Sequence, residues 1–338
     1  MTGARSTLED VAARAGVSRA TASRVLNGSP RVSDDARVRV EAAVAAIGYT
    51  PNRAARSLAV HRSETVALVV SEPSVRLFAD PFFAGTTLGI TGELGATRYQ
   101  LVLLMTPSDA DRPRTEDHLL HGGADGVLVL SARAGDPLPA RLARAGIPCV
   151  VAGRPPAGAG DAVGFVDADN EGGARQAVAH LVERGRQVVG TVAGPSDMAP
   201  GVDRRAGWAR GLAQAGRLAP ADLVSEADFT REGGAAATRA LLARRPQLDG
   251  LFVASDLMAL GALDALRAAG RRVPDDVAVV GFDDSELARS ADPALTTVRQ
   301  PIERLGARMA RLLLDQLERD APPVGEVLST ELVVRRST

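Results

Sequence analysis

The sequence lacks lysine, contains a single cysteine and has few aromatic residues. All 40 cationic side chains are arginines, which, with the excess of alanine and glycine, indicates a GC-rich genome rather than a mechanism. The lone Cys149 lies within the apolar run Pro148 to Val151 and has no second cysteine to pair with. An intramolecular disulfide is therefore excluded, and we expect a buried structural thiol.

Long apolar runs and catalytic motifs are also missing. No run approaches the roughly 18 to 20 residues of a membrane span, and the N-terminus has no apolar signal stretch, so we expect a cytoplasmic protein without a membrane partner. The segment Gly89–Gly95 lacks the spacing of a dinucleotide fingerprint, and no phosphate loop occurs. His118 and His121 have the spacing of one helix face, but without nearby cysteines they predict surface residues rather than a metal site. We expect no catalytic residues, no cofactor and no metal.

Residues 7–27 carry the pattern of two short amphipathic helices. Thr7 is placed to cap the first helix with Asp10 at the capping-box position, and Gly16 ends that helix before Ser18 caps the second. Apolar residues recur at helical spacing in both segments, and the outward face of the second segment is polar and cationic. This arrangement is typical of a helix-turn-helix that reads DNA.

The second helix of a helix-turn-helix lays its N-terminal residues against base edges in the major groove. Arg19, Ala20 and Arg24 are thus expected to read sequence, because arginine binds guanine with two hydrogen bonds and alanine contacts the thymine methyl group. Polar side chains better suited to phosphate oxygens are those of Thr21, Ser23 and Asn27.

Charge is divided unequally along the chain, which opposes the alternative of a solvated hairpin without nucleic acid. Residues 1–62 hold ten arginines against five acids, a net charge of +5, whereas the other 276 residues have a net charge of −6. A basic head supplies the phosphate attraction that a DNA reader needs, and an acidic body resists nonspecific binding.

The segment after the helix pair predicts a third helix and then a conditional one. The third runs from Asp34 to about Ala46, and its apolar face, with Val40, Val44 and Ile47, closes a three-helix core before Gly48. Pro51 then stops regular structure, and the good helix formers that follow, at about 51–60, are too few for a stable helix in water.

The segments LEDVAARAGVSRATASRVLNG, from Leu8, and YTPNRAARSLA, from Tyr49, resemble the lactose/galactose repressor (LacI/GalR) family of bacterial transcription regulators. The resemblance extends over nearly the whole chain. It implies a homodimer whose hinge helices fold on double-stranded operator DNA, with Leu58 as a minor-groove wedge. The other expected DNA contacts in these segments are Thr7, Ser18, Tyr49, Asn52 and Ala55.

From Thr65 onward, short β-branched runs alternate with helical segments in two series. This alternation predicts two doubly wound parallel sheets, so the fold class is α/β: an all-α helix-turn-helix head with a hinge helix, then a bilobed core like that of periplasmic binding proteins. We expect the head at 1–62 and the core at 63–338, with an N-lobe at about 63–165 and 299–325 and a C-lobe at about 166–298 and 326–338. We expect the run VGFV, Val163–Val166, to be the first strand of the second series. The stretch Pro155–Gly160 lies just before the point where the chain is expected to cross from one lobe to the other.

Ligands bind outside the carboxyl ends of strands in open parallel sheets. Polar and aromatic residues gather at or near these expected ends, and among them the resemblance matches Arg204 and Asp283 to residues that hold effector hydroxyls or polar ring atoms. It matches Phe82, Phe83, Phe229 and Ser255 to pocket-lining positions, and we add Trp208 as an aromatic wall. Asp256 remains open to a capping role and Asp284 to a structural one.

A carboxylate, a guanidinium and aromatic walls suit a mono- or oligosaccharide effector. Met198, six residues before Arg204, stands where the purine-repressor branch has a ligand-binding arginine, which argues against a purine. A nucleoside or other metabolite, a sugar receptor and an enzyme using Asp256, Asp283 and Asp284 remain as alternatives. The loop Ser71–Asp80 is longer than usual, and the helix Ile302–Glu318 is either a dimer surface or a core helix.

Overall fold

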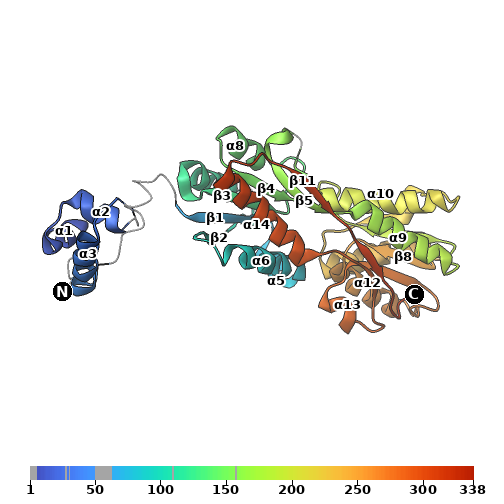
Figure 1. Ribbon diagram of the computed structural model, residues 1–338. Helices are drawn as coiled ribbons and strands as arrows, with labels where there is room; N and C mark the ends of the chain where they lie inside the picture. Colours follow the sequence, from blue (N-terminus) through green and yellow to red (C-terminus); the bar gives the residue numbers. More distant parts are fainter. Residues whose placement is uncertain (1–5, 27–28, 30, 50–62, 109, 157) are drawn as a thin grey trace. The chain divides into compact units, whose positions relative to one another are not determined.

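The structure is a computed structural model that describes residues 6–26, 29, 31–49, 63–108, 110–156 and 158–338. The chain divides into two compact units, Met1–Ser63 and Glu64–Thr338. We call them the head and the core and describe each by itself (Figure 1). The hinge helix expected at about 51–60 lies outside the described residues.

Three helices form the described part of the head: α1, Leu8–Ala15; α2, Arg19–Leu26; and α3, Asp34–Ile47. Thr7 and Asp10 cap α1 reciprocally, since the Thr7 N–H donates to the Asp10 carboxylate at 2.8 Å and the Asp10 N–H donates to the Thr7 hydroxyl at 3.3 Å. Gly16 ends α1 with a left-handed φ of 63°, a conformation that glycine adopts without steric cost. The predicted capping box is confirmed.

Small and β-branched side chains from all three helices meet in the centre of the head. Val11, Ala22 and Val40 are 0% exposed, and Val44 and Ile47 pack half-buried against them. The predicted three-helix core is confirmed. Because Ala22 and Val25 point inward, the opposite face of α2 is left at the surface.

Two six-stranded sheets build the two lobes of the core. In the first sheet all neighbours are parallel, in the order β11-β5-β4-β3-β1-β2. The strands are β1, Thr65–Val70; β2, Gln100–Met105; β3, Gly126–Leu130; β4, Cys149–Ala152; β5, Gly164–Ala168; and β11, Gly325–Leu328. The central strands β1, β3 and β4 are buried over nearly their whole length, which explains their continuous apolar sequence.

The second sheet repeats this order as β12-β10-β9-β8-β6-β7, and only the edge strand β12 runs antiparallel to its neighbour. Its strands are β6, Val189–Ala193; β7, Val224–Glu226; β8, Gly250–Val253; β9, Ala278–Asp283; β10, Thr296–Arg299; and β12, Glu331–Val333. The predicted class of two doubly wound, mainly parallel sheets is confirmed.

Helices cover both sheets (Figure 1). Those near the first sheet are α5, Ser74–Ala79; α6, Pro81–Leu94; α7, Arg112–His118; α8, Leu138–Arg144; and α14, Ile302–Arg319. Those of the second lobe are α9, Asn170–Glu183; α10, Ala199–Gln214; α11, Arg231–Arg244; α12, Asp256–Ala268; and α13, Glu286–Ser290. Among the described residues, no helix is long and apolar enough to cross a membrane.

Helix α14 packs one face against α6 and the first sheet. Leu305, Met309 and Leu313 are at most 3% exposed. A Cβ atom at Gly306 would lie 2.1 Å from the Thr86 carbonyl oxygen, so only glycine allows the two helices to approach this closely. One of the two expected roles of this segment, that of a core helix, therefore agrees with the structure.

The chain crosses between the sheets after β5, after β10 and after β11. The assignment of Val163–Val166 to the second series was wrong, because β5 pairs with β4 and β11 in the first sheet. The crossing lies at Asp169, beyond the Pro155–Gly160 stretch. Strand patterning cannot distinguish two similar sheets, and the β11 partner comes much later in the chain.

Two further segments bear on the candidate site. Helix α10 begins at Ala199, with Pro200 in its first turn, where proline is tolerated. The long loop after β1 contains α5, and Asp80 then caps α6 by accepting the Phe82 N–H at 3.0 Å. These two segments position the side chains described next.

Candidate functional site

A cavity lies between the two lobes and is lined by residues of both. Strands β4, β5, β9 and β10 end at or beside it, as expected for parallel sheets. The first lobe contributes Arg76, Asp80, Phe82, Ser131, Ala132, Ala152, Gly153, Arg154, Asp167 and Leu305. The second contributes Asn170, Met198, Ala199, Pro200, Arg204, Phe229, Ser255 and Asp283, and the crossing segment contributes Gln300.

Arg204 extends from α10 into the cavity and is 5% exposed. Its Nε donates to the Asn170 side-chain oxygen at 2.8 Å, and its Nη1 donates to the Ala254 carbonyl at 2.6 Å. The guanidinium carbon lies 3.7 Å from the centre of the Phe282 ring. Burial lowers the Arg204 pKa, and nearby carboxylates, with Asp283 foremost, raise it in part. The guanidinium is thus fixed in place before any ligand contact.

Asp283 ends β9 and lies opposite Arg204, with 3.7 Å between a carboxylate oxygen and Nη1. The Gln300 amide donates to Asp283 at 2.6 Å, and the Asp256 backbone N–H donates at 3.3 Å. Burial raises the Asp283 pKa well above its ordinary value, while attraction to Arg204 lowers it in part. The predicted pair is brought together, and both members line the cavity.

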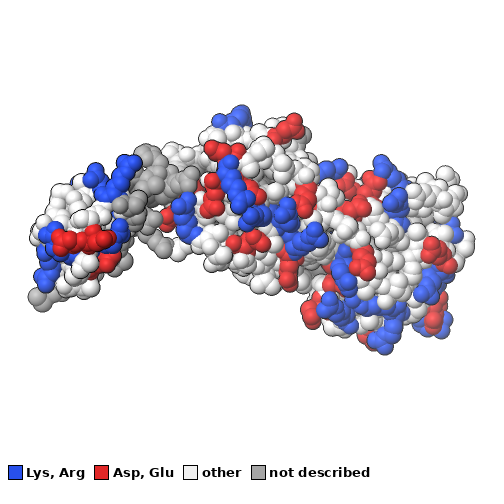
Figure 2. All heavy atoms as spheres, viewed as in Figure 1, with Lys and Arg blue, Asp and Glu red and all other residues white. Residues whose placement is uncertain are grey.

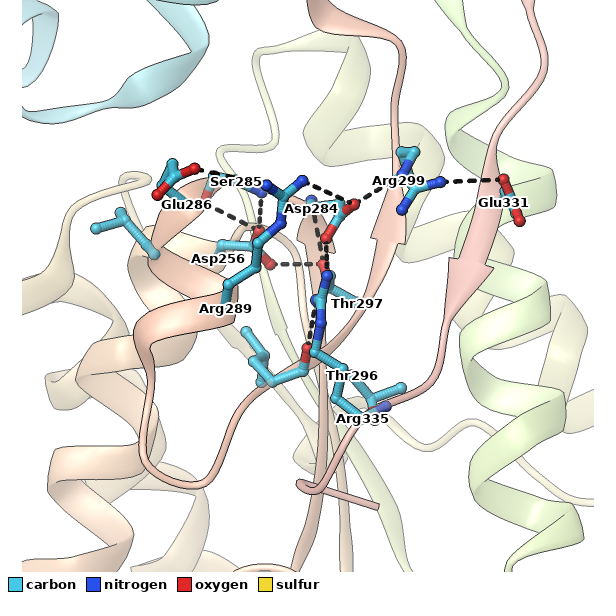
Figure 3. Close-up of polar contacts among 12 residues, drawn as sticks. Asp256, Asp284, Ser285, Glu286, Arg289, Thr296, Thr297, Arg299, Glu331 and Arg335 are labelled. Atoms are coloured by element: carbon cyan, nitrogen blue, oxygen red, sulfur yellow. Dashed lines mark hydrogen bonds and ion pairs between the residues drawn. The ribbon is translucent and has the colours of Figure 1, made fainter.

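Asp284 forms a separate cluster with arginines (Figure 3). Its side chain is 1% exposed and accepts Arg299 Nε at 2.7 Å, together with a short hydrogen bond from Arg335. Arg289 adds an ion pair at 3.8 Å. Asp283 and Asp284 have positive φ values, 127° and 57°, which are unfavourable for aspartate unless surrounding contacts hold them. The arginine cluster therefore helps to fix the backbone that carries the Asp283 carboxylate.

Asp256 also stabilises the backbone around Asp283 and Asp284. It accepts the Thr297 hydroxyl at 2.6 Å and the Ser285 N–H at 2.8 Å, and it is 1% exposed (Figure 3). Burial raises its pKa to about 7, and these hydrogen bonds lower it in part. The helix cap expected of Asp256 is made instead by Ser255, whose hydroxyl accepts the Met258 N–H at 3.2 Å. Ser255 also lines the cavity.

Two first-lobe carboxylates line the cavity without having been predicted. Asp80, the cap of α6, has its pKa raised by burial. Asp167 accepts the Ala168 N–H and the Asn170 amide, each at 2.8 Å, and burial raises its pKa to about 6. Both could have been found from the sequence, because each lies beside the end of a strand or the start of a helix. The same position in the pattern would also have identified Asn170 and Gln300.

The four predicted aromatic residues have two different fates. Phe82 and Phe229 line the cavity, whereas Phe83, 2% exposed, packs into the first-lobe core in edge-to-face contact with Phe82. The structure does not bring Trp208 to the cavity, because it is 1% exposed within the second-lobe core and its indole N–H donates to the Val189 carbonyl at 3.2 Å. Neighbouring helical positions point about 100° apart, so Phe82 and Phe83 do not share a face.

The lining residues suit a neutral ligand with many hydroxyl groups. Three arginines and three aspartates line the cavity, so their charges balance. Carboxylates accept and guanidiniums donate directed hydrogen bonds, and two phenylalanine rings offer apolar faces. Met198, 3% exposed, lines the same wall as Arg204.

Cys149 and the histidines take no part in this site. Cys149 is 1% exposed, and burial raises its pKa to about 12, which leaves an unreactive thiol. His118 and His121 are exposed. Across the part of the chain that the structure describes, no group of three or more metal-ligating side chains lies together.

The head presents a second candidate surface on α2. Arg19, Ala20 and Arg24 are exposed, and Arg19 forms an exposed ion pair with Glu9 at 2.8 Å. Ser18 accepts the Thr21 N–H at 3.1 Å, while Thr21 and Ser23 are half-buried. Thr7 is exposed at the start of α1, and Tyr49 packs against the head core. The other four predicted DNA contacts lie outside the described residues: Asn27, Asn52, Ala55 and Leu58.

Charges on the core differ from this basic surface. Figure 2 shows arginine and acidic side chains interspersed over the visible face of the core. Most of the ion pairs there join side chains that are partly exposed, such as Arg231 with Asp264 and Arg308 with Glu326. Such pairs contribute little to stability. Most of the charged side chains that line the cavity are instead buried.

Comparisons with known proteins cover both the head and the core. Residues 7–52 match the family model described as bacterial regulatory proteins, lacI family, and residues 178–338 match a periplasmic binding protein-like domain. The HTH-type transcriptional regulator CelR of Thermobifida fusca is 50% identical over 334 residues, 98% of each chain.

Two solved structures match nearly the whole chain. A complex of transcriptional regulator CelR with cellobiose is 48% identical with a TM-score of 0.80, and the match covers 99% of this chain and 100% of that one. A Lac repressor dimer bound to operator and the anti-inducer ONPF is 29% identical with a TM-score of 0.83, and the match covers 99% of both chains.

Proposed function

The chain belongs to the lacI family of bacterial regulatory proteins, and from this premise we propose that it is a dimeric repressor whose operator binding is controlled by a sugar in the interlobe cavity. The relatives it matches are transcriptional regulators, so the chain is a regulator and not an enzyme.

The buried Arg204–Asp283 pair is the observation that carries the sugar assignment. Both side chains are less than a tenth exposed and are held by further hydrogen bonds, yet both line the cavity. A sugar hydroxyl accepts from a guanidinium and donates to a carboxylate at the same time, so one pair recognises one or two hydroxyls. The Phe82 and Phe229 rings suit the apolar C–H face of a pyranose.

Cellobiose, the ligand named for the solved relative, is the effector that we propose first. Its neutrality fits a wall with balanced charge. Met198 stands where a purine-binding arginine is expected in the purine-repressor branch, which opposes a purine.

The proposed output is operator release. The outward face of α2, with Arg19, Ala20 and Arg24, reads bases, and the Thr21 and Ser23 hydroxyls contact phosphates. Two heads bind a palindromic operator together, and Leu58 inserts at the central base step only when the two heads are correctly spaced. A sugar changes this output only if its affinity differs between the DNA-bound and released arrangements.

The test starts by selecting operator sequences from random DNA with the purified full-length protein. Operator affinity is then measured by fluorescence anisotropy with cellobiose, glucose, lactose, ribose, hypoxanthine or cytidine, and oligomeric state by sedimentation. We expect a palindromic operator and a dimer. Saturating cellobiose is expected to lower operator affinity at least about tenfold, which corresponds to about 1.4 kcal/mol. A response to hypoxanthine or cytidine alone would establish the non-sugar alternative. If the selection yields no preferred DNA sequence, sequence-specific DNA binding is refuted.

A further inference from the structure

Helix α5 carries an arginine from the first lobe to the second. The Arg76 guanidinium carbon lies 4.9 Å from the centre of the Phe229 ring, which belongs to the second lobe, and 5.7 Å from that of Phe83 in the first. Leu77, the next residue of α5, is buried in the first-lobe core. Arg76 thus joins the two lobes where it lines the cavity between them.

The surroundings of Arg76 favour its contact with the ring. The residue is 8% exposed and forms an ion pair with Glu72, which is 2% exposed. Its Nε has no hydrogen-bond partner among the described residues. The Glu72 carboxylate compensates the buried charge, while a planar guanidinium stacks on an aromatic face in a way that an ammonium does not.

Phe229 is held in position independently of Arg76. Its φ of 63° is left-handed, and the residues on either side lock this turn, since the Thr230 hydroxyl donates to Asp228 at 2.6 Å and then accepts the Gly233 N–H at 2.9 Å. A Cβ atom at Gly194 would lie 2.3 Å from the Phe229 ring, so the ring packs directly on that backbone. Phe229 is therefore a fixed surface against which Arg76 closes.

Other contacts also join the lobes: the Ala134 N–H donates to the Asp197 carbonyl at 2.7 Å, the Asn170 amide donates to Asp167 at 2.8 Å, and two ion pairs each have at least one exposed member. Arg133 pairs with Asp197 at 2.7 Å with side chains 36% and 50% exposed, and Arg154 pairs with Asp203. Solvent screens exposed pairs, whereas a desolvated cation over a ring keeps most of its attraction. Compared with these ion pairs, the contact between Arg76 and Phe229 is expected to contribute more to lobe closure.

We propose that Arg76 and Phe229 form a latch that holds the lobes closed over the bound sugar and slows its release. Arg76 is a positioning residue in this scheme, because it acts on the ligand through lobe closure and the Phe229 wall. The ligand arm of the proposal rests on the proposed function, whereas the contact itself does not depend on any ligand.

The first experiment is a double-mutant cycle on cellobiose affinity, measured by calorimetry with the full-length chain. Arg76→Gln and Phe229→Leu are each expected to weaken binding roughly 3- to 30-fold. The double variant is expected to bind no more weakly than the weaker single variant, because one contact is lost in all three. Multiplicative losses would overturn the latch and show that the two residues act separately.

Two controls separate the latch from general charge loss. Arg98→Gln removes an arginine 5.5 Å from the Tyr99 ring, a contact made within the first lobe only, and is expected to leave affinity unchanged. Arg133→Gln removes an exposed interlobe ion pair and is expected to weaken binding less than about 3-fold. A loss at Arg133 equal to that at Arg76 would also contradict a dominant latch.

The second experiment uses hydrogen exchange without any sugar. The amides of Leu77 and Asp80 donate to the Pro73 and Arg76 carbonyls within α5. Phe229→Leu, in the other lobe, is expected to speed their exchange roughly 3- to 30-fold, and unchanged rates would refute the latch. If wild type binds no cellobiose, the proposed effector fails, while this measurement still decides the latch.

Discussion

The head and the core use arginine in opposite ways. In the head, Arg19 is 70% exposed on the side chain and pairs with an equally accessible Glu9, 60% exposed. In the core, Arg204 is 5% exposed and every contact it makes is to buried polar groups or a ring. An exposed cation remains hydrated until DNA arrives, whereas a buried one requires compensating partners at all times.

This difference separates binding from stability. Removing an exposed arginine of the head is expected to remove its proposed contact with DNA and little else. Removing a buried one leaves its partner carboxylate without compensation, so folding and ligand response are lost together. Each of the following substitutions tests whether a charged residue serves stability, ligand or DNA binding, or both.

Arg204→Met is expected to cost about 3 to 5 kcal/mol of unfolding free energy, because Asp283 is left buried and uncompensated. The response of operator binding to the effector should also disappear. Chemical denaturation and anisotropy titrations measure the two effects. Arg210→Gln, on the same helix but in an exposed pair with Glu171, should change stability by less than about 1 kcal/mol. A variant at Arg204 that keeps its effector response would contradict the site.

Asp284→Asn is expected to cost about 2 to 3 kcal/mol, since hydrogen bonds from arginines to its buried carboxylate are lost. Effector affinity should fall as well, although Asp284 does not line the cavity, because its cluster fixes the Asp283 backbone. Glu286→Gln is the control, with a side chain that is 89% exposed. Unchanged affinity in a destabilised Asp284 variant would show that the cluster serves stability alone.

Asp167→Asn is expected to change the pH dependence of stability. The folded pKa of about 6 lies above the ordinary 3.8, so the folded state retains a proton that the unfolded state releases between these values. Asp167 therefore makes the wild type lose stability as pH rises from 4 through 6. The Asn variant is expected to lose less, by on the order of 2 kcal/mol, since the raised pKa values of Asp80, Asp256 and Asp283 still act in it. Thermal unfolding from pH 4 to 7 measures it, with the exposed Asp161→Asn as control. Parallel curves for wild type and Asp167→Asn would contradict the expectation.

The smallest change in stability is expected at Arg19. Arg19→Ala should weaken operator binding by about 1 to 3 kcal/mol and relax base preference, while unfolding of the head stays within about 0.5 kcal/mol. Glu9→Gln frees Arg19 from its ion pair and should leave operator affinity equal or tighter. An unchanged operator affinity and an unchanged base preference in Arg19→Ala would exclude Arg19 as a reader of bases.

The sequence located much of the cavity because strand ends are local features. Asp283 ends β9, as expected of a residue at the carboxyl edge of the sheet, whereas Arg204, which the resemblance indicated, reaches it from helix α10. Trp208 was wrong as a cleft residue for a related reason: which face of α10 points to the cavity depends on where the helix begins and how it packs. The start at Ala199 was not apparent from the sequence.

Arg76 shows a different limit. The long loop after β1 was recognised, but its helix is only six residues long, too short to be identified from periodicity. The partner ring of Arg76 is in the other lobe, and no spacing rule connects residues across a crossing. Chemistry between lobes is therefore the part of the site that sequence patterns describe least.

The sequence by itself determined the local elements of this protein: the capped helices of the head, the apolar strands and the polar residues at strand ends. Such features depend on side chains a few residues apart, whose energetics are the same in any fold. Tertiary structure decided that β5 joins the first sheet between β4 and β11 and that Phe83 and Trp208 enter cores. It also decided that Arg76 meets Phe229, because burial and long-range pairing depend on the whole chain being folded.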